Sequence, residues 1–134
     1  MTLKIEHIGI AVSDLEKSNL LFKMLLGTDP YKSEVVLEEG VSVSFFKTGD
    51  TKIELLQALH EESPIARFIG KKGEGIHHLA FEVDDILESM AHMEKLGFEL
   101  LSKEPKQGAD NKLICFLHPK TTNGVLIELC QERK

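Results

Sequence analysis

The chain has 134 residues, of which 42% are hydrophobic and 28% charged, and its formal net charge is −6. This length and balance predict one globular domain, residues 1–134, that can bury a core without disulfide bonds. An acidic chain without a basic run is not expected to bind nucleic acid, and none of its apolar runs has membrane-spanning length.

The expected location follows from the N-terminus and the cysteines. The first residues show no basic segment followed by an apolar one, so we expect no signal peptide. Cys115 and Cys130 form neither a Cys-x-x-Cys pair nor a disulfide framework. A reducing compartment suits such cysteines, and the cytoplasm is therefore the expected location.

The first predicted elements are a strand and a helix. Residues 4–12 predict a strand whose bulky apolar side chains alternate with a face of small residues around His7. Ser13 followed by Glu16 is a capping-box pattern, which predicts the start of a helix that ends at Gly27. The bulky face of the strand should pack on this helix. The helix residues assigned to the packing stripe are Leu15, Leu20, Phe22, Leu25 and Leu26.

Three further strands complete a first module of about residues 4–57. They are predicted at residues 31–37, 41–47 and 51–57. The order of elements in this module is therefore βαβββ. A linker follows over about residues 58–75, and Ser63-Pro64 predicts the start of a short helix within it.

The second module, about residues 76–130, repeats the order of the first. A predicted strand over residues 76–83 precedes a helix that begins at Asp85 and ends at Gly97. Three strands follow, at about residues 97–102, 112–117 and 124–130. The sequence therefore predicts an α+β fold, in which two repeated βαβββ modules form a curved, mixed and mainly antiparallel sheet around a metal site.

The metal site is predicted from the register of the repeat. His78 minus His7 is 71, and Glu128 minus Glu54 is 74, so each module carries one His early and one Glu late. Two copies of one unit are expected to pack on each other, which would bring the four side chains together. Two imidazoles and two carboxylates form a ligand set for a divalent metal ion. His77 would face away from this site, because adjacent strand residues point to opposite faces.

Each of these residues also has a simpler interpretation. A histidine such as His7 or His78, taken alone, is more often a hydrogen-bonded core residue than a ligand. Glu54 and Glu128 would be solvated if their strands exposed one face to water, whereas a buried carboxylate is costly unless it is paired or bound to metal. The repeat favours the metal site, because four matches of residue type and position are hard to obtain without a shared site.

The motifs around these residues resemble those of the vicinal oxygen chelate superfamily and, within it, of the methylmalonyl-CoA epimerase family. The motifs are His7-Ile8-Gly9-Ile10-Ala11-Val12, Ile53-Glu54-Leu55-Leu56, Ser63-Pro64-Ile65-Ala66, Gly73-Glu74-Gly75-Ile76-His77-His78 and Phe116-Leu117-His118-Pro119-Lys120. The match covers nearly the whole chain. The first two motifs are widespread in the superfamily, and the last two are more specific.

The resemblance implies a cofactor, a substrate and partners. The metal ligands would be His7, Glu54, His78 and Glu128, and the ion would be divalent, such as cobalt, manganese or nickel. The implied activity is epimerisation of methylmalonyl-CoA at C2 through a metal-stabilised enolate. The substrate would be an acyl-CoA, and the protein would be a homodimer.

The proton carriers are only partly identified by the resemblance. Glu128 is the candidate base for one face of C2. Val43 stands where some epimerases carry a second catalytic Glu, so the carrier for the other face stays open between an ordered water, Glu82 and Glu39, in falling order of preference. His118 is a candidate either for substrate contact or for a turn. The candidate cations for the CoA phosphates are Lys71, Lys72 and Lys120.

Two alternative functions share the same scaffold. One is a glyoxalase I-type lactoylglutathione lyase, which the His118-Pro119-Lys120 segment disfavours because that enzyme more often shows an Asp-Pro-Asp-Gly type of turn. The other is a non-catalytic protein that binds a small molecule, and the retention of all four ligand residues argues against it.

Overall fold

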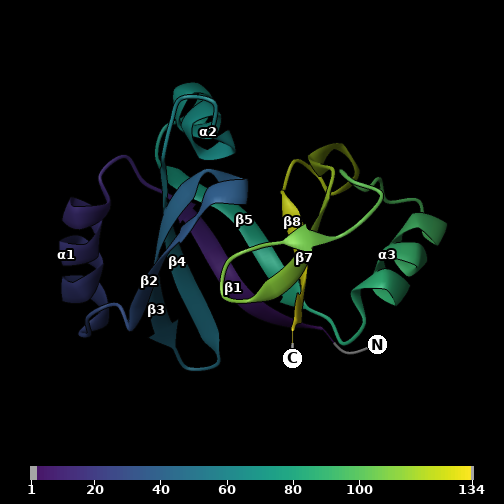
Figure 1. Ribbon diagram of the computed structural model, residues 1–134, viewed down its shortest axis with the longest axis horizontal. Helices are drawn as coiled ribbons and strands as arrows, with labels where there is room; N and C mark the ends of the chain where they lie inside the picture. Colours follow the sequence, from purple (N-terminus) through teal and green to yellow (C-terminus); the bar gives the residue numbers. More distant parts are fainter. Residues whose placement is uncertain (1–2, 134) are drawn as a thin grey trace. The chain divides into compact units, whose positions relative to one another are not determined.

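The computed structural model describes residues 3–133, which form two compact units (Figure 1). The first unit runs from His7 to His77, and the second combines the chain from His78 onward with the described residues before His7. Each repeat has the element order βαβββ, so the predicted α+β fold with two repeated modules is confirmed. Among the described residues, no helix is long and apolar enough to span a membrane.

The first unit is built on a four-stranded sheet with the strand order β2-β3-β4-β1. Its elements are β1 (Lys4–Ala11, from His7 onward), α1 (Leu15–Leu26), β2 (Lys32–Val36), η1 (Leu37–Glu39), β3 (Val41–Thr48), β4 (Thr51–Ala58) and α2 (Pro64–Lys72). β1 and β4 are parallel, and the other neighbours are antiparallel. Helix α1 contacts β3 and β4, and α2 contacts β4.

The start of α1 differs from the prediction by one residue. Asp14, not Ser13, is the N-cap, because its carboxylate accepts a hydrogen bond from the backbone amide of Lys17 at 3.1 Å. The backbone amide of Ser13 instead donates to the Glu74 carboxylate at 2.7 Å. The end of the helix is as predicted, since Gly27 adopts the left-handed conformation with φ of +76°.

The packing stripe of α1 is only partly as predicted. Leu15, Phe22 and Leu26 pack beside a core cluster of buried side chains from the sheet. Leu20 and Leu25 are 65% and 70% exposed, so their assignment to the core was wrong. The reason is that α1 carries apolar residues on all sides, and at 3.6 residues per turn Leu20 lies about 140° around the helix from Leu15.

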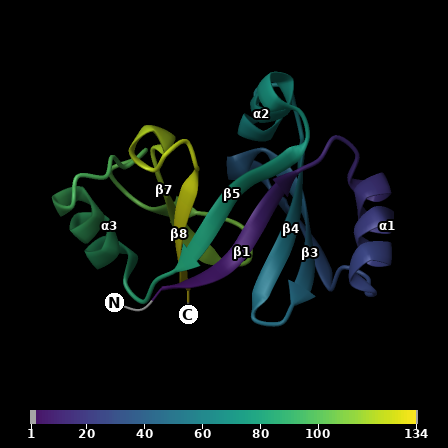
Figure 2. The same cartoon turned by 180° about the vertical axis from the view of Figure 1, so that it is seen from behind.

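The second unit has a sheet with the strand order β5-β8-β7-β6 (Figure 2). Its elements are β5 (Gly75–Glu82, from His78 onward), α3 (Ile86–Lys95), β6 (Lys106–Gln107), β7 (Lys112–Leu117), η2 (Pro119–Thr121) and β8 (Ile127–Glu132). β5 and β8 are parallel, and the remaining pairs are antiparallel. Helix α3 is capped by Asp85, as predicted, and packs on β7 and β8 through Ile86, Met90 and Met93.

The prediction of a strand at residues 97–102 is wrong. Leu100 forms only an isolated bridge with Leu117. On the side away from β8, the strand that pairs with β7 is the two-residue β6, which lies in the predicted loop. The alternating apolar residues that suggested a strand, Phe98 and Leu100, are partly buried against the core under α3. The segment makes two backbone hydrogen bonds to the end of β7, from Leu101 N to Phe116 O at 2.9 Å and from His118 N to Glu99 O at 2.7 Å, but these do not extend into a strand.

Candidate metal and proton-transfer site

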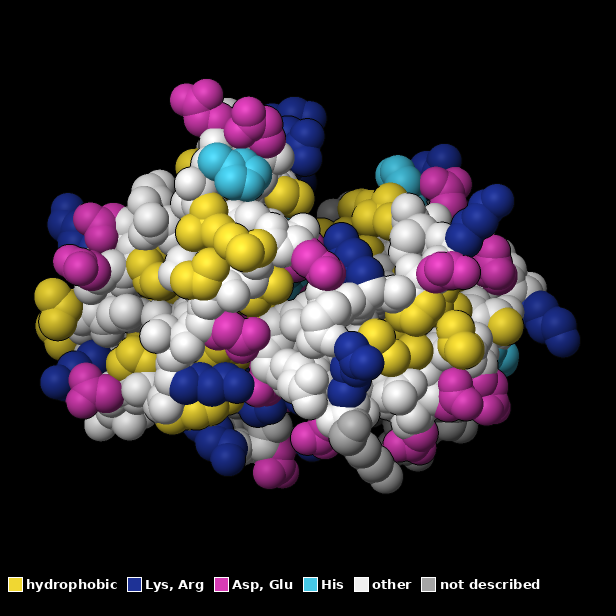
Figure 3. All heavy atoms as spheres, in the orientation of Figure 1, with side chains coloured by type: hydrophobic (Ala, Val, Ile, Leu, Met, Phe, Trp, Pro, Cys, Tyr) yellow, Lys and Arg dark blue, Asp and Glu magenta, His cyan; other side chains and the backbone are white. Residues whose placement is uncertain are grey.

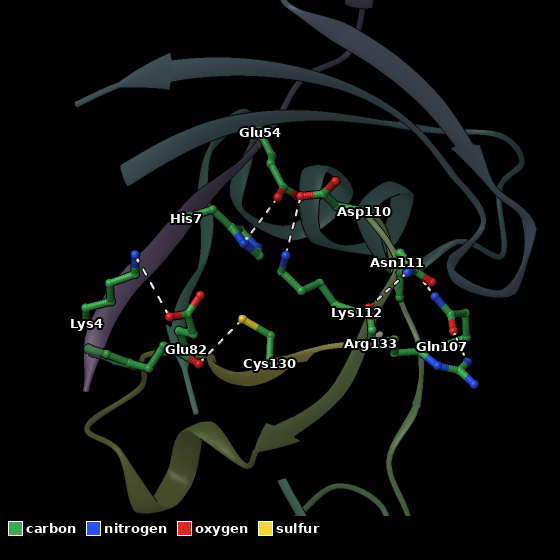
Figure 4. A network of polar contacts seen from close by, with 12 residues as sticks. Lys4, His7, Glu54, Glu82, Gln107, Asp110, Asn111, Lys112, Cys130 and Arg133 are labelled. Atoms are coloured by element: carbon green, nitrogen blue, oxygen red, sulfur yellow. Dashed lines mark hydrogen bonds and ion pairs between the residues drawn. The ribbon is translucent and has the colours of Figure 1, made fainter. Parts of the chain in front are cut away.

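In the first unit, His7 and Glu54 form a buried pair on neighbouring parallel strands. Nδ1 of His7 lies 3.2 Å from Oε2 of Glu54, and the two side chains are only 5% and 4% exposed (Figure 4). The register aligns Gly9 with Glu54. Because His7 and Gly9 are two residues apart, they share one face of β1, and this face carries the pair.

In the second unit, His78 and Glu128 form the corresponding pair. Nε2 of His78 lies 3.3 Å from Oε1 of Glu128, and these side chains are 6% and 5% exposed. Ala80 is aligned with Glu128 across the parallel strands β5 and β8. The ring of Phe116, which lies opposite Glu128 on β7, meets the His78 ring edge to face at 5.9 Å.

The two pairs are built in the same way. In each unit the His lies on the first strand and the Glu on the last, and these strands are parallel neighbours. In each unit the residue two positions after the His, Gly9 or Ala80, is aligned with the Glu. The repeat seen in the sequence therefore extends to the strand register of the site.

The donor atoms of the pairs suit a divalent cation. Each pair offers an imidazole nitrogen and a carboxylate oxygen, which are ligand types of zinc, cobalt, nickel and manganese. The interpretation of Glu54 and Glu128 as solvated residues is wrong, because the whole residues, backbone included, are only 3% and 4% exposed. A carboxylate buried to this degree needs a cation or strong hydrogen bonds, and a bound metal ion would meet that need.

His77 lies in different surroundings from His78. Its ring is half-buried and contacts the Phe68 ring edge to face, with 5.0 Å between the ring centres. Burial lowers the pKa of His77 to about 4, which keeps the imidazole neutral at neutral pH. His77, on β5, therefore packs against Phe68 of α2 as an aromatic side chain.

The strand next to Glu54 presents an apolar surface. Val41, Val43 and Phe45 alternate along β3 and are all buried. Phe45 lies opposite Glu54 and Val43 opposite Leu56 in the antiparallel register, so both valine and phenylalanine share the face of the carboxylate. Val43 has no group that could exchange a proton.

The other candidate proton carriers lie in different units. Glu82 belongs to the second unit, shares the His78 face of β5 by alternation, and is ion-paired with Lys4 at 3.9 Å. Glu39 belongs to the first unit, where it ends the short turn Leu37–Glu39 and is partly exposed. Of these two residues, Glu82 is thus the one in the unit of Glu128.

The segment after β7 has contacts of its own. Nδ1 of His118 accepts a hydrogen bond from the backbone amide of Lys120 at 3.1 Å, which caps the short turn Pro119–Thr121. Nζ of Lys120 lies 2.9 Å from Oε1 of Glu99, and this hydrogen bond lowers the pKa of the Glu99 carboxyl. His118 therefore stabilises the turn, and Lys120 already has an anionic neighbour.

Lys112 is a buried charged residue that the sequence analysis missed. It is 5% exposed, and its ammonium lies 3.6 Å from the Asp110 carboxylate (Figure 4). Along β7, Lys112 lies two and four residues before Ile114 and Phe116, so the three side chains share one face of the strand, and Phe116 is the residue paired with Glu128 on β8. The sequence analysis placed Lys112 at the start of the strand predicted at residues 112–117, but it did not predict that the side chain is buried.

Comparison with known proteins assigns the chain to a family. Residues 6–116 match the family described as the Glyoxalase/Bleomycin resistance protein/Dioxygenase superfamily. The chain is 44% identical to the mitochondrial methylmalonyl-CoA epimerase of Homo sapiens over 129 residues, covering 96% of this chain and 73% of that protein. It is 43% identical to the ethylmalonyl-CoA/methylmalonyl-CoA epimerase of Cereibacter sphaeroides, covering 96% and 97% of the two chains.

A solved structure of another methylmalonyl-CoA epimerase has the same fold as this chain. A variant of the Streptomyces coelicolor methylmalonyl-CoA epimerase, in complex with 2-nitronate-propionyl-CoA, superposes with a TM-score of 0.91. The identity is 34%, and the match covers 98% of each chain. These relatives are isomerases by name, and they match almost the full length of this chain. The chain therefore belongs to the glyoxalase/bleomycin resistance protein/dioxygenase superfamily, and within it to the family of the methylmalonyl-CoA epimerases.

Proposed function

We propose that this protein is a metal-dependent epimerase that inverts C2 of methylmalonyl-CoA. The observation that carries the proposal is the pair of buried His–Glu contacts at equivalent positions of the two units. Two sequence relatives named as methylmalonyl-CoA epimerases are 42% and 44% identical over 96% of this chain, which supports the same substrate class.

The proposed metal site takes both pairs to one divalent ion. The ligands are His7, Glu54, His78 and Glu128, with cobalt, manganese or nickel as suitable ions. Two neutral imidazoles and two carboxylates sum to a charge of −2, which balances a divalent cation. When bound, such an ion would act as a Lewis acid toward the substrate oxygens.

Glu128 is the proposed base for one face of C2. The C2 proton lies between a thioester carbonyl and a carboxylate, and its removal leaves an enolate with charge on the thioester oxygen. Glu128 would take this proton on its carboxylate oxygen, which requires that it be a loosely held ligand, because firm metal binding lowers basicity. Phe116 and the buried strands around it would exclude bulk water from this step.

The proton for the opposite face needs a different carrier. Val43 is apolar and buried, so a second glutamate on β3 is absent at that position. We keep an ordered water as the first choice, Glu82 as the second and Glu39 as the third. Glu82 ranks above Glu39 because it shares the strand face of His78 in the unit that also holds Glu128.

The remaining proposals concern partners and location. The substrate is an acyl-CoA, and the exposed lysines Lys71 and Lys72, with Lys120, are the candidates for its phosphates. The solved relatives with methylmalonyl-CoA and with 2-nitronate-propionyl-CoA support an acyl-CoA ligand. We also propose a homodimer and, because the buried residues Cys115 and Cys130 form no disulfide bond, a reducing compartment such as the cytoplasm.

One paired assay tests the function. The purified protein, loaded with cobalt, manganese or nickel in turn, is incubated with methylmalonyl-CoA in deuterated water, and deuterium at C2 is followed by mass spectrometry. A parallel reaction offers the glutathione hemithioacetal of methylglyoxal. We expect exchange and epimerisation only in the first reaction. Turnover of the hemithioacetal alone would identify a lactoylglutathione lyase, and binding without turnover would identify a non-catalytic protein.

A further inference from the structure

Lys112 is a buried cation to which the proposed function gives no role. Among the described residues 3–133 it is the only lysine or arginine that is buried, and its side chain is 6% exposed. Figure 3 shows basic side chains spread over the surface among acidic ones, which is the usual place of lysine. Burial of an ammonium is costly, so the position of Lys112 inside the second unit requires a reason.

The ammonium of Lys112 can bind more than its one neighbour. Nζ lies 3.6 Å from Oδ2 of Asp110, and the side chain of Lys112 extends from β7 toward this carboxylate (Figure 4). A charge-assisted hydrogen bond is about 2.7–2.9 Å long, and an ammonium has three hydrogens to donate. The carboxylate of Asp110 therefore balances the charge of the ammonium and leaves hydrogens for a further group.

Lys112 and Glu128 lie on the same face of the second sheet. Lys112 and Phe116 are four residues apart on β7, so their side chains point to one face, and Phe116 is paired with Glu128 on β8. Next to the Glu128 carboxylate, this face carries a buried apolar cluster, which consists of Ala80, Ile114 and Cys130. The face therefore presents a carboxylate and an ammonium with apolar side chains beside them.

The spacing of these two groups suits a small acyl group. Four residues of a strand span about 13 Å, and the extended four-carbon stem of a lysine reaches about 6 Å. The ammonium of Lys112 and the carboxylate of Glu128 can therefore approach a carbon atom that lies between them from its two sides.

We propose that Lys112 carries the C2 proton on the face opposite Glu128. The inference rests on the proposed epimerase function and names a residue for the step that Val43 leaves open. The earlier candidates came from the sequence, which did not predict the burial of Lys112. Glu82 is 37% exposed and Glu39 is partly exposed, so bulk water would compete for a proton held on either carboxylate. An ordered water would need two to four polar partners, whereas the surface beside Glu128 is apolar.

The proposed step balances in both directions. For one epimer, the neutral amine of Lys112 takes the C2 proton, the electrons of the C2–H bond enter the enolate, and protonated Glu128 delivers a proton to the other face. For the other epimer, the Glu128 carboxylate takes the proton and the ammonium of Lys112 delivers one. Proton exchange of both groups with solvent then restores the starting states. Lysine is one of the side chains that serve as general acid or base in enzymes.

Deuterium incorporation at C2, measured from each epimer of methylmalonyl-CoA separately, tests the proposal. Lys112→Met removes the exchangeable proton, and Lys112→Arg keeps the positive charge but cannot release its proton. Lys103→Met is the control, because Lys103 is an exposed lysine of the same unit. Circular dichroism checks the fold of each variant, and elemental analysis checks its metal content.

We expect both Lys112 variants to lose exchange from one epimer by on the order of 10²–10⁴-fold and to keep exchange from the other, because Glu128 still serves that face. Interconversion of the epimers should fall in both directions. Glu128→Gln should show the opposite preference between the epimers, and the Lys103→Met control should exchange both like the wild type.

Four results would overturn the proposal. Near wild-type exchange from both epimers in Lys112→Met would show that Lys112 carries no proton. Full activity in Lys112→Arg would show that the charge alone is sufficient, and this variant decides the matter if Lys112→Met does not fold. An equal loss from both epimers, with metal retained, would indicate a role in substrate binding. A wild type that exchanges neither epimer would refute the proposed function, and this inference with it.

Discussion

Replacement of Glu128 by Gln separates metal binding from proton transfer. The carboxylate is 5% exposed and 3.3 Å from Nε2 of His78, so the isosteric amide should fit without opening a cavity. Its oxygen can still act as a neutral ligand, but the amide cannot take up a proton at neutral pH. We therefore expect Glu128→Gln to fold and to retain a bound divalent ion.

The expected loss of activity comes from the missing base. A positioned general base contributes about 10²–10⁴-fold to a rate, which corresponds to about 3–5 kcal/mol of transition-state stabilisation. The assay measures deuterium incorporation at C2 from each epimer separately, together with metal content by elemental analysis. Glu132→Gln is the matched control, because Glu132 lies on the same face of β8, four residues further on, and is exposed. It should exchange within about twofold of the wild type, since a solvated carboxylate outside the site contributes little.

One outcome would refute this reasoning. If Glu128→Gln keeps its metal and exchanges at near wild-type rate from both epimers, Glu128 is a ligand and not a base. The loss should then appear in Glu82→Gln, which tests the next candidate in the same unit. If neither variant loses exchange, the remaining candidates are an ordered water molecule, Glu39 and Lys112.

Three further predictions concern the metal ligands, the stability of the fold at acid pH and the buried lysine. His78→Ala should abolish tight metal binding and His77→Ala should not, and equal metal content in the two variants would contradict the ligand assignment. His77 titrates near 4 in the fold and near 6.5 when unfolded, so the unfolded chain binds the proton first as pH falls below 6.5 and the fold loses stability. The loss from pH 7 to pH 5 should be about 2 kcal/mol in urea unfolding and should disappear in His77→Phe; an unchanged pH dependence would refute it. Lys112→Met should lower the unfolding free energy by roughly 1–3 kcal/mol. The double variant with Asp110→Asn should cost less than the sum of the single changes, whereas full additivity would show that the pair does not interact.

Most of the fold could be predicted from the sequence because the chain contains two copies of one unit. The two His strands alternate bulky and small residues, and Asp85 and Gly27 are strong helix-boundary signals, so the order βαβββ could be predicted twice. The failures came where local patterns had two physical causes. Phe98 and Leu100 alternate because they pack under α3, and Leu20 is apolar on the solvent side of its helix. Periodicity alone does not separate these cases.

The same contrast holds at the site. The two His–Glu pairs could be predicted because residue type and position repeat, and each Glu lies between apolar neighbours of its strand. Lys112 has no counterpart in the repeat, and lysine is rarely buried, so residue type pointed to the surface. The turn that precedes it, at Asp110 and Asn111, has φ values of 58° and 54°, which are unusual for residues other than glycine.

The parallel pairing of the first and last strands would link the proposed ion binding to folding. His7 and Glu54 are 47 residues apart, and His78 and Glu128 are 50 residues apart, so neither pair forms from local structure. Each pair requires that its two parallel strands, which are the first and last of the repeat, lie side by side. An ion held by these pairs binds the native state and not a partly folded one, and it shifts the folding equilibrium by mass action. The measured metal affinity would then depend on the fraction of molecules in which both parallel strand pairs are formed.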